Sequence, residues 1–241
     1  MKLHSIVLGM IILSLSLLPA VAGAATPSIG QVSRITGSQL GNAEAPGGAA
    51  RKLAAGDPIF AGERIRTGAG TVLQIEFTDK SRFLLGPNSE FEVGRYSYAP
   101  GGAEEAAFHS RIIKGAFRFV TGLVARSQGK NMKVSVAVAT IGIRGTQVEG
   151  EVTERQEKDG RTVDASAKVA LLEPEGSDTG NAIIVENQFG SVVVDKPGYG
   201  TEIPDEKSPP SPVKRMQLRT IDNLLRAIRT PARTGGPARK P

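Results

Sequence analysis

Arg144 is the residue whose surroundings most strongly indicate a specific role. It lies in the apolar, β-branched stretch VAVATIGIRGTQVEGEV, between Gly142 and Gly145. Glycine inside a strand permits a bulge, a positive φ or the close approach of another backbone. Two glycines three residues apart therefore predict a sharp bend, where the strand passes from one sheet to another. We expect Gly142, Gly145 and the following Thr146 to serve mainly backbone geometry.

At such a bend, the Arg144 side chain is expected to point into a crevice rather than into bulk water. There its guanidinium can form a bidentate pair with a carboxylate or bind carbonyl groups that the bend leaves free. Candidate carboxylates come from turns and a strand that must pack nearby, namely Asp57, Glu63 and Glu76. The alternative role is direct contact with a ligand or partner, with Asp57 and Glu63 as further candidate binding residues.

Few side chains are suited to catalysis. The chain has no Cys, and His109 is the only histidine beyond the N-terminal apolar run. No G-x-S-x-G, H-E-x-x-H or phosphate-loop motif is present. A carboxylate pair for glycoside hydrolysis has no sequence signature, so an enzyme with such a site is the least favoured hypothesis. We predict no catalytic residue and no cofactor.

Calcium coordination by Asp57, Glu63 and Asp79 is a further hypothesis. However, the chain has no D-x-[DN]-x-[DN]-G run. Asp79 also falls at a predicted hairpin turn, where Asp is common for reasons of local hydrogen bonding. We therefore predict no metal site.

The N-terminus has the pattern of a secretory signal peptide over residues 1–24. A positive end precedes an apolar run from Ile6 to Leu18, and small residues follow Pro19. Cleavage is expected after Ala24 or Ala25. The apolar run is shorter than the ~20 residues of a spanning helix, which favours a periplasmic protein over the alternative, an N-terminal anchor in the inner membrane.

Residues 26–204 are predicted to form an all-β region. Turn signals recur there every ~8–12 residues between short β-branched runs, which is typical of an antiparallel sandwich or β-roll of many short strands. Gly62 and Gly68 are expected in tight turns. Lys114-Gly115 is predicted as a turn between two strands, and Asp159-Gly160 as a type I′ hairpin turn.

The basic charge is concentrated in residues 205–241. This tail holds nine Lys or Arg and three acids, a difference equal to the whole net charge of +6. A short amphipathic helix over about residues 212–229 is predicted by apolar residues at helical spacing, which are Leu218, Ile221, Leu225 and Ile228. Because the excess charge rests on the tail and the chain is expected to be exported, no nucleic-acid partner is predicted.

Three roles for the predicted helix are open. It can be a solvated helix, a helix that lies on an anionic membrane or binds an acidic partner, or a lid docked on the β body through its apolar stripe. In the second role, the contacts would come from its basic side chains, Lys214, Arg215, Arg219, Arg226 and Arg229.

Several motifs follow one another over about residues 53–155. They are the turn GDP, the turn GERIRTG, the hairpin IEFTDKSRFLLGPNS, the strand KGAF and the closing ATIGIRGT. This order resembles the FecR domain of exported bacterial proteins, which implies an all-β extracytoplasmic domain. That family is best known as the sensing part of transmembrane regulators that relay a receptor signal to a cytoplasmic sigma factor. Because only a few residues precede the apolar run, this chain is expected to resemble the stand-alone exported members and to lack a cytoplasmic signalling part.

The resemblance and the residues together favour an exported, non-enzymatic sensor or envelope-assembly module that binds an envelope protein in the periplasm. Docking or strand addition at sheet edges and loops is the expected mechanism, with the turns at 56–70 and the stretch around Arg144 at its rim. The alternative is a carbohydrate- or cell-envelope-binding module. A sugar site would need aromatic platforms, for which the best candidates are Tyr96, Tyr98, Phe117 and Phe119.

Overall fold

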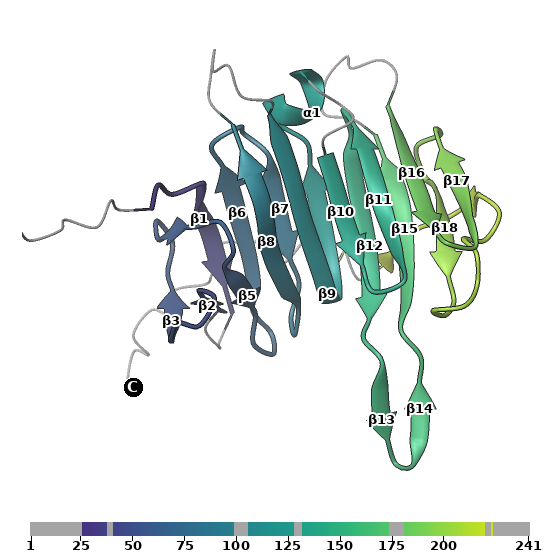
Figure 1. Cartoon of the computed structure of the whole chain (residues 1–241), viewed down its shortest axis with the longest axis horizontal. Helices are drawn as coiled ribbons and strands as arrows, with labels where there is room; N and C mark the ends of the chain where they lie inside the picture. Colours follow the sequence, from purple (N-terminus) through teal and green to yellow (C-terminus); the bar gives the residue numbers. More distant parts are fainter. Residues whose placement is uncertain are drawn as a thin grey trace, which may run out of the picture.

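The computed structural model describes residues 26–37, 41–98, 106–127, 132–173, 181–219 and 223. These residues form two large sheets, which pack face to face into an elongated sandwich whose strands lie across its long axis (Figure 1). The all-β prediction is therefore confirmed. The predicted signal peptide lies outside the described residues, and no helix among the described residues has the length and hydropathy needed to cross a membrane.

The first of the two sheets, sheet A, extends from β4 (Pro58–Ile59) to β19 (Lys214–Arg215). In spatial order its strands are β4, β1 (Gly30–Thr36), β6 (Val72–Phe77), β7 (Arg82–Leu85), the second half of β9 (Ala107–Val120), β12 (Gln147–Thr153), β15 (Ser166–Leu172), β18 (Tyr199–Ile203) and β19.

Sheet B lies against it and shares β9. In spatial order its strands are β3 (Ala50–Leu53), β2 (Gly41–Glu44), β5 (Arg64–Arg66), β8 (Glu90–Ser97), the first half of β9, β10 (Met132–Val136), β11 (Ala139–Arg144), β16 (Ala182–Asn187) and β17 (Gly190–Val194). Among the described strand pairs, β9 and β10 are parallel and the others are antiparallel.

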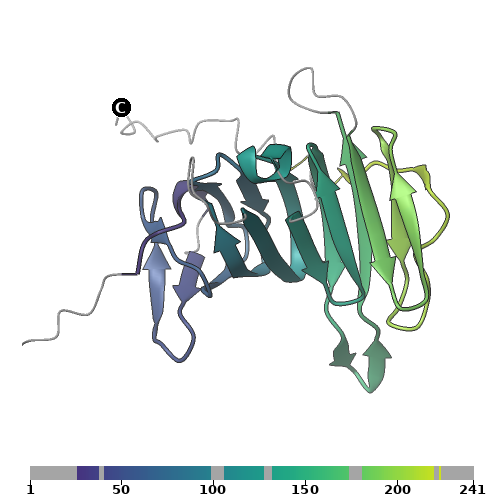
Figure 2. The ribbon, with the colours of Figure 1, turned by 45° about the horizontal axis from the view of Figure 1, so that its top comes forward.

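The core fills the space between the sheets. Alternate residues of the strands are buried, as in β6 and β10, so each strand presents one face to the core. Aromatic rings join the two layers. Phe83 of sheet A stacks on Phe91 of sheet B with centroids 4.3 Å apart, and Phe77 meets Phe108 edge-on at 4.9 Å. Helix α1 (Leu123–Ser127) sits over one end of the strands (Figure 2).

Strand β9 passes from one sheet to the other at Gly115. Its first half pairs with β8 and β10, and its second half pairs with β7 and β12. Gly115 has φ +101°, and a Cβ there would lie 2.6 Å from the Cα of Ser89. The prediction of a turn between two separate strands at Lys114-Gly115 is therefore wrong. The glycine bends one continuous strand of 14 residues.

The sheet change predicted around Arg144 is present, and Gly145 makes it. Strand β11 belongs to sheet B and β12 to sheet A, and Gly145 between them has φ +48°. Gly142 lies inside β11 without a positive φ, and the nearest atom to a Cβ built on it is 3.9 Å away. Gly142 is therefore not needed for the bend, contrary to the prediction.

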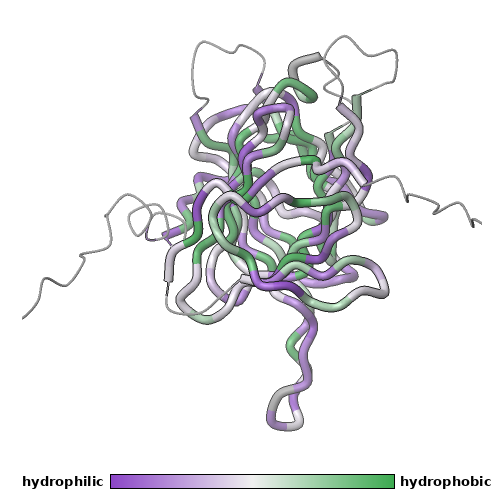
Figure 3. The backbone as a smooth tube through the Cα atoms, turned by 90° about the vertical axis from the view of Figure 1, so that its left-hand side faces the viewer, coloured by the Kyte–Doolittle hydropathy of each residue, from purple (hydrophilic) through white to green (hydrophobic). Residues whose placement is uncertain are grey.

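A hairpin projects from the body between β12 and β15. Its strands are β13 (Gln156–Lys158) and β14 (Arg161–Val163), and its tip is Asp159-Gly160, with φ of 52° and 69°. Two positive φ values at the tip confirm the predicted type I′ turn. The hairpin stands clear of the sandwich and is mainly hydrophilic (Figure 3).

The C-terminal helix does not begin at residue 212. Lys214–Arg215 form β19 beside β18 instead. Arg219 and Asn223 have helical backbone, and the rest of the predicted helix, with Arg226 and Arg229, lies outside the described residues. Leu218 is buried on the outer face of sheet A in a cluster with Val72, Leu84 and Ala116.

Candidate functional site

Arg144 is exposed, which corrects the prediction of a guanidinium enclosed in a crevice. Ile141 and Ile143 point into the core, so the alternation of β11 directs Arg144 to the outer face of sheet B. Within the described part of the chain, no hydrogen bond or ion pair to its guanidinium is found. Arg144 therefore remains a candidate contact residue rather than an internal brace.

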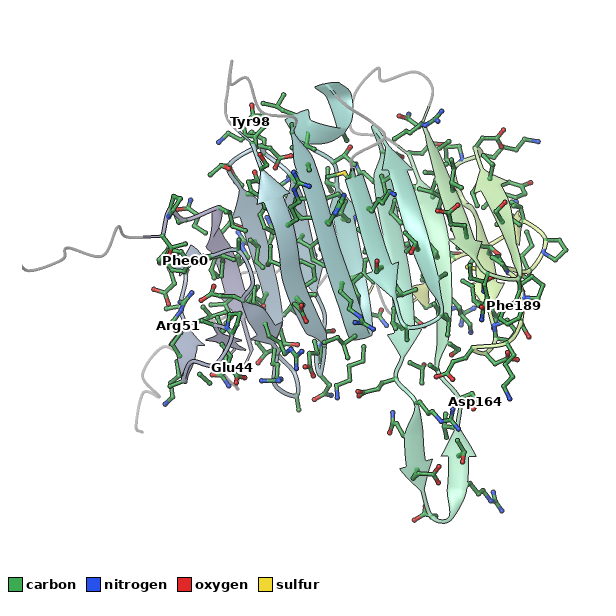
Figure 4. The ribbon with its side chains drawn as sticks, viewed as in Figure 1. Glu44, Arg51, Phe60, Tyr98, Asp164 and Phe189 are labelled. Carbon is green, nitrogen blue, oxygen red and sulfur yellow. The ribbon has the colours of Figure 1, made fainter. Side chains whose placement is uncertain are left out.

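Glu63 is buried and fully used within the fold. The guanidinium of Arg51 donates to it, with Nη2 2.9 Å from Oε1 and 3.0 Å from Oε2, and the N–H of Phe60 donates to Oε2 at 2.9 Å. Arg51 and Phe60 lie at the end of the sandwich formed by β2 and β3 (Figure 4). Glu63 is thus neither the partner of Arg144 nor an accessible binding residue.

The other predicted partners of Arg144 are also used locally. Asp57 accepts a hydrogen bond from the N–H of Ala54 at 2.7 Å and so closes its own turn. The Glu76 carboxylate lies 3.2 Å from the Nζ of Lys80. Neither carboxylate is therefore the partner that was predicted for Arg144.

The predicted turn glycines have different requirements. Gly62 has φ +83°, as a tight turn demands. Gly68 has no positive φ, and in the same turn it is Gly70 that adopts one, at +73°. Thr146 is buried, and its hydroxyl has no hydrogen-bond partner, while its carbonyl accepts from the N–H of Thr121 at 3.1 Å.

Asp79 is a central residue that sequence reasoning assigned only to a turn. Its carboxylate is fully buried. It accepts hydrogen bonds from the backbone and hydroxyl of Ser81 at 3.1 and 2.7 Å, from the hydroxyl of Tyr96 at 3.2 Å and from the N–H of Val124 at 3.3 Å. The D-x-S spacing could have revealed the Ser81 bonds, but not the distant donors.

The network around Asp79 ties α1 to the β6–β7 hairpin. The backbone N–H of Leu123 donates to the carbonyl of Asp79 at 2.8 Å, and that of Gly122 donates to the hydroxyl of Ser81 at 2.9 Å. Burial of the Tyr96 phenol raises its pKa well above the ordinary value. The Tyr96 phenol therefore stays neutral and can donate a hydrogen bond to the carboxylate.

The aromatic residues considered for a sugar platform do not form one. Phe117 and Phe119 are fully buried in the core. Tyr96 stacks on Phe77 with centroids 5.7 Å apart and is held by Asp79. Tyr98 follows the end of β8 and is partly buried against the core (Figure 4). These four rings therefore offer no exposed platform on which a sugar could stack.

Four basic side chains gather on the outer face of sheet B instead. They are Arg95 of β8, Arg111 of β9, Lys133 of β10 and Arg144 of β11, and we call them the basic strip. These strands are neighbours in the middle of the sheet (Figure 1). All four side chains are exposed, and no acidic partner of any of them is found among residues with described positions.

The neighbouring part of the same sheet face is electrically compensated. Arg66 lies 2.6 Å from a carboxylate oxygen of Glu44 and 3.2 Å from one of Glu90, and the Glu44 bond is the main cause that raises the pKa of Arg66. Lys114 lies 3.0 Å from Glu154. Acidic partners thus accompany Arg66 and Lys114, whereas none is found among the described residues for the cations of the basic strip.

A shallow hollow of about 340 Å³ lies at the edge of the basic strip, next to Arg111. Its lining includes Glu92, His109, Arg111 and Ser135 beside a bulge at Gly94. Burial lowers the pKa of His109, and the charges of Lys133 and Arg95 lower it further. The lowered pKa is consistent with the position of His109 between these two cations.

Of the tail residues predicted as contacts, Lys214, Arg215 and Arg219 lie within the described residues. Lys214 lies 3.1 Å from the Glu202 carboxylate, and Arg215 and Arg219 are exposed. Among the described residues, no three His, Cys, Asp or Glu side chains gather as metal ligands would. In particular, Glu63 and Asp79, considered for calcium, are each occupied by donors of the protein itself.

Residues 63–173 match the family model described as FecR protein. The match begins at Glu63, includes the Asp79 network and the sheet change at Gly145, and ends after β15. This chain therefore contains a FecR domain, as its motifs predicted. No curated protein and no solved structure matches the chain. Strands on both sides of the match, such as β1 and β18, complete the same two sheets.

Proposed function

We propose that this FecR-domain chain is an exported, non-enzymatic module that binds another protein of the cell envelope, as a sensor or an assembly component. The projecting β13–β14 hairpin carries the proposal. Its two short strands present open backbone edges away from the body (Figure 1). Strand addition to such an edge is a common way to bind an extended segment of another protein.

The hairpin makes no evident contribution to the core. From Arg155 to Asp164, every residue whose side chain is described is exposed, including Val163 at 44%. An isolated two-stranded hairpin is marginally stable in water. Its root is held by ion pairs, with 3.0 Å between Lys114 and Glu154 and 3.2 Å between Arg155 and Glu206. An ordered, anchored arm that adds little to folding is best explained by an external contact.

Replacing residues 156–163 by Asn-Gly is expected to abolish capture of the partner and leave the sandwich folded. The shortened loop still connects β12 to β15, and the pairing of Thr153 with Ser166 is retained. We expect the melting temperature to change by less than about 3 °C, which corresponds to about 1 kcal/mol for a domain of this size. The measurement is cross-linking and co-purification of tagged protein from the periplasm, followed by reconstitution with the purified partner.

A matched variant keeps the hairpin and changes one side chain, Thr162→Ala, which removes only the bond to Glu157 at 2.7 Å. It should still capture the partner. Failure of the unaltered chain to capture any protein would contradict the proposed function. Equal capture by the shortened chain would show that the hairpin is not the contact.

A further inference from the structure

The geometry points to the basic strip as a docking site for an acidic segment of the protein partner. The inference rests on the proposed function and names a second surface for it, separate from the hairpin. Arg95, Arg111, Lys133 and Arg144 are exposed on one sheet face without an acidic partner among the described residues. Unmatched charges of one sign gathered on one surface attract and orient a partner of opposite charge.

The strand register places these charges on one sheet face in a diagonal band. Lys133 pairs with His109 on one side and with Gly142 on the other. Arg111 follows His109 by two residues and Arg144 follows Gly142 by two, so both lie on the same face as Lys133. Arg95 lies in the bulge opposite His109. Across the four strands, at ~4.8 Å spacing, the strip is about 14 Å wide. Along the strands, Arg111 and Arg144 lie on opposite sides of Lys133, because it is Thr140 that is level with Arg111.

This arrangement suits an extended anion rather than a compact one. The side chains come from four strands and do not converge on one point, as they would around a single phosphate or carboxylate. An extended peptide advances ~3.3 Å per residue, so a run of four or five Asp or Glu residues spans about the same 14 Å. The hollow at Gly94 gives such a segment a shallow seat.

A protein segment fits this surface better than an acidic polysaccharide. Sugar recognition commonly uses exposed aromatic rings. The phenylalanines of the strip's strands, such as Phe91 of β8 and Phe108 of β9, are buried in the core instead. No ion pair between the strip and the acids nearest to it is found among the described residues. Glu92 lies opposite Arg111 in the register, but its carboxylate pairs with Arg64 at 3.2 Å. Glu186 lies one strand away on β16, opposite Thr140.

The test measures binding of a fluorescent peptide of eight glutamates to the full chain and to Lys133→Glu/Arg144→Glu. We expect binding at least tenfold weaker in the double variant at low salt. Binding by the unaltered chain should fall steeply at about 0.5 M NaCl, because exposed charges are screened over a few ångströms there. The melting temperature of the variant should be unchanged, since neither side chain has an ion pair to lose within the described structure.

A matched variant, Lys52→Glu/Lys196→Glu, makes the same change of charge at exposed cations of β3 and of the turn after β17. It should bind the peptide as the unaltered chain does, and the cations of the C-terminal tail are common to both variants. Equal weakening in the two variants would overturn the inference. So would tighter, strip-dependent binding of polygalacturonate than of the peptide.

The same variants separate this inference from the proposed function. If the strip variant still captures the protein partner as well as the unaltered chain, the strip is not the docking site but the binding module stands. If the unaltered chain captures no protein, the proposed function itself fails, whatever the peptide does.

Discussion

Asp79→Ala is expected to destabilise the protein by about 3 kcal/mol, because it leaves several buried donors without an acceptor. The carboxylate accepts from the backbone and hydroxyl of Ser81, from Tyr96 and from Val124, and it is fully buried. Removing it also takes away the Val124 bond, one of the bonds that tie α1 to the β6–β7 hairpin. Urea denaturation followed by circular dichroism measures the loss.

Asp57→Ala is the matched control for Asp79. Asp57 also closes a turn, with its oxygen 2.7 Å from the N–H of Ala54, but the site is partly exposed, so water can replace the carboxylate. We expect a loss of about 1 kcal/mol or less. If both substitutions cost the same, Asp79 is an ordinary turn residue and the buried network does not hold the end of the sandwich.

Gly115→Ala is expected to cost about 4 kcal/mol, from a strained backbone and an overfilled site together. Its φ of +101° is unfavourable for any residue with a Cβ, and the new Cβ would lie 2.6 Å from the Cα of Ser89. Because β9 pairs with strands of both sheets, neither sheet can shift to relieve the collision without disturbing the other. Equilibrium unfolding and the yield of folded protein measure the effect.

Gly160→Ala separates the two causes. Gly160 also has a positive φ, +69°, but nothing lies within 4 Å of a Cβ placed there. Only the backbone cost should appear, about 1 kcal/mol or less. A loss at Gly115 as small as that at Gly160 would mean that β9 does not need a close approach at its bend.

The sheet change at Gly145 could be predicted because a glycine within a β-branched run often marks a bulge or a bend. The direction of Arg144 could also have been derived. Ile141 and Ile143 are core residues, so the period of two assigns residues 142 and 144 to the outer face. The prediction of a buried guanidinium gave the apolar character of the stretch more weight than its alternation.

Other features need the register, which the sequence does not contain. Asp79 looks like a turn residue because two of its donors, Tyr96 and Val124, come from distant segments. Lys114-Gly115 has the composition of a turn, and only the pairing of both halves of β9 shows a continuous strand. The basic strip joins residues up to 49 positions apart, from 95 to 144, on four strands. No local pattern could have gathered them.

The position of Leu218 bears on the three roles considered for the tail. Its side chain is buried against Val72, Leu84 and Ala116, and its N–H lies 3.4 Å from the carboxylate of Glu149. The beginning of the apolar stripe thus contacts the outer face of sheet A, opposite to the face that carries the basic strip. The two outer faces of the sandwich are therefore not equivalent, since Leu218 covers part of sheet A and the basic strip lies on sheet B.

Site-specific photo-cross-linking tests most directly whether the outer face of sheet B contacts a protein partner. A photoreactive residue replaces Thr140, which lies on that face beside the basic strip, or Lys168, which lies on the outer face of sheet A. We predict a protein adduct from position 140 in the periplasm, and little or none from position 168. Adducts from position 168 alone, or from neither position, would contradict docking of the partner on the outer face of sheet B.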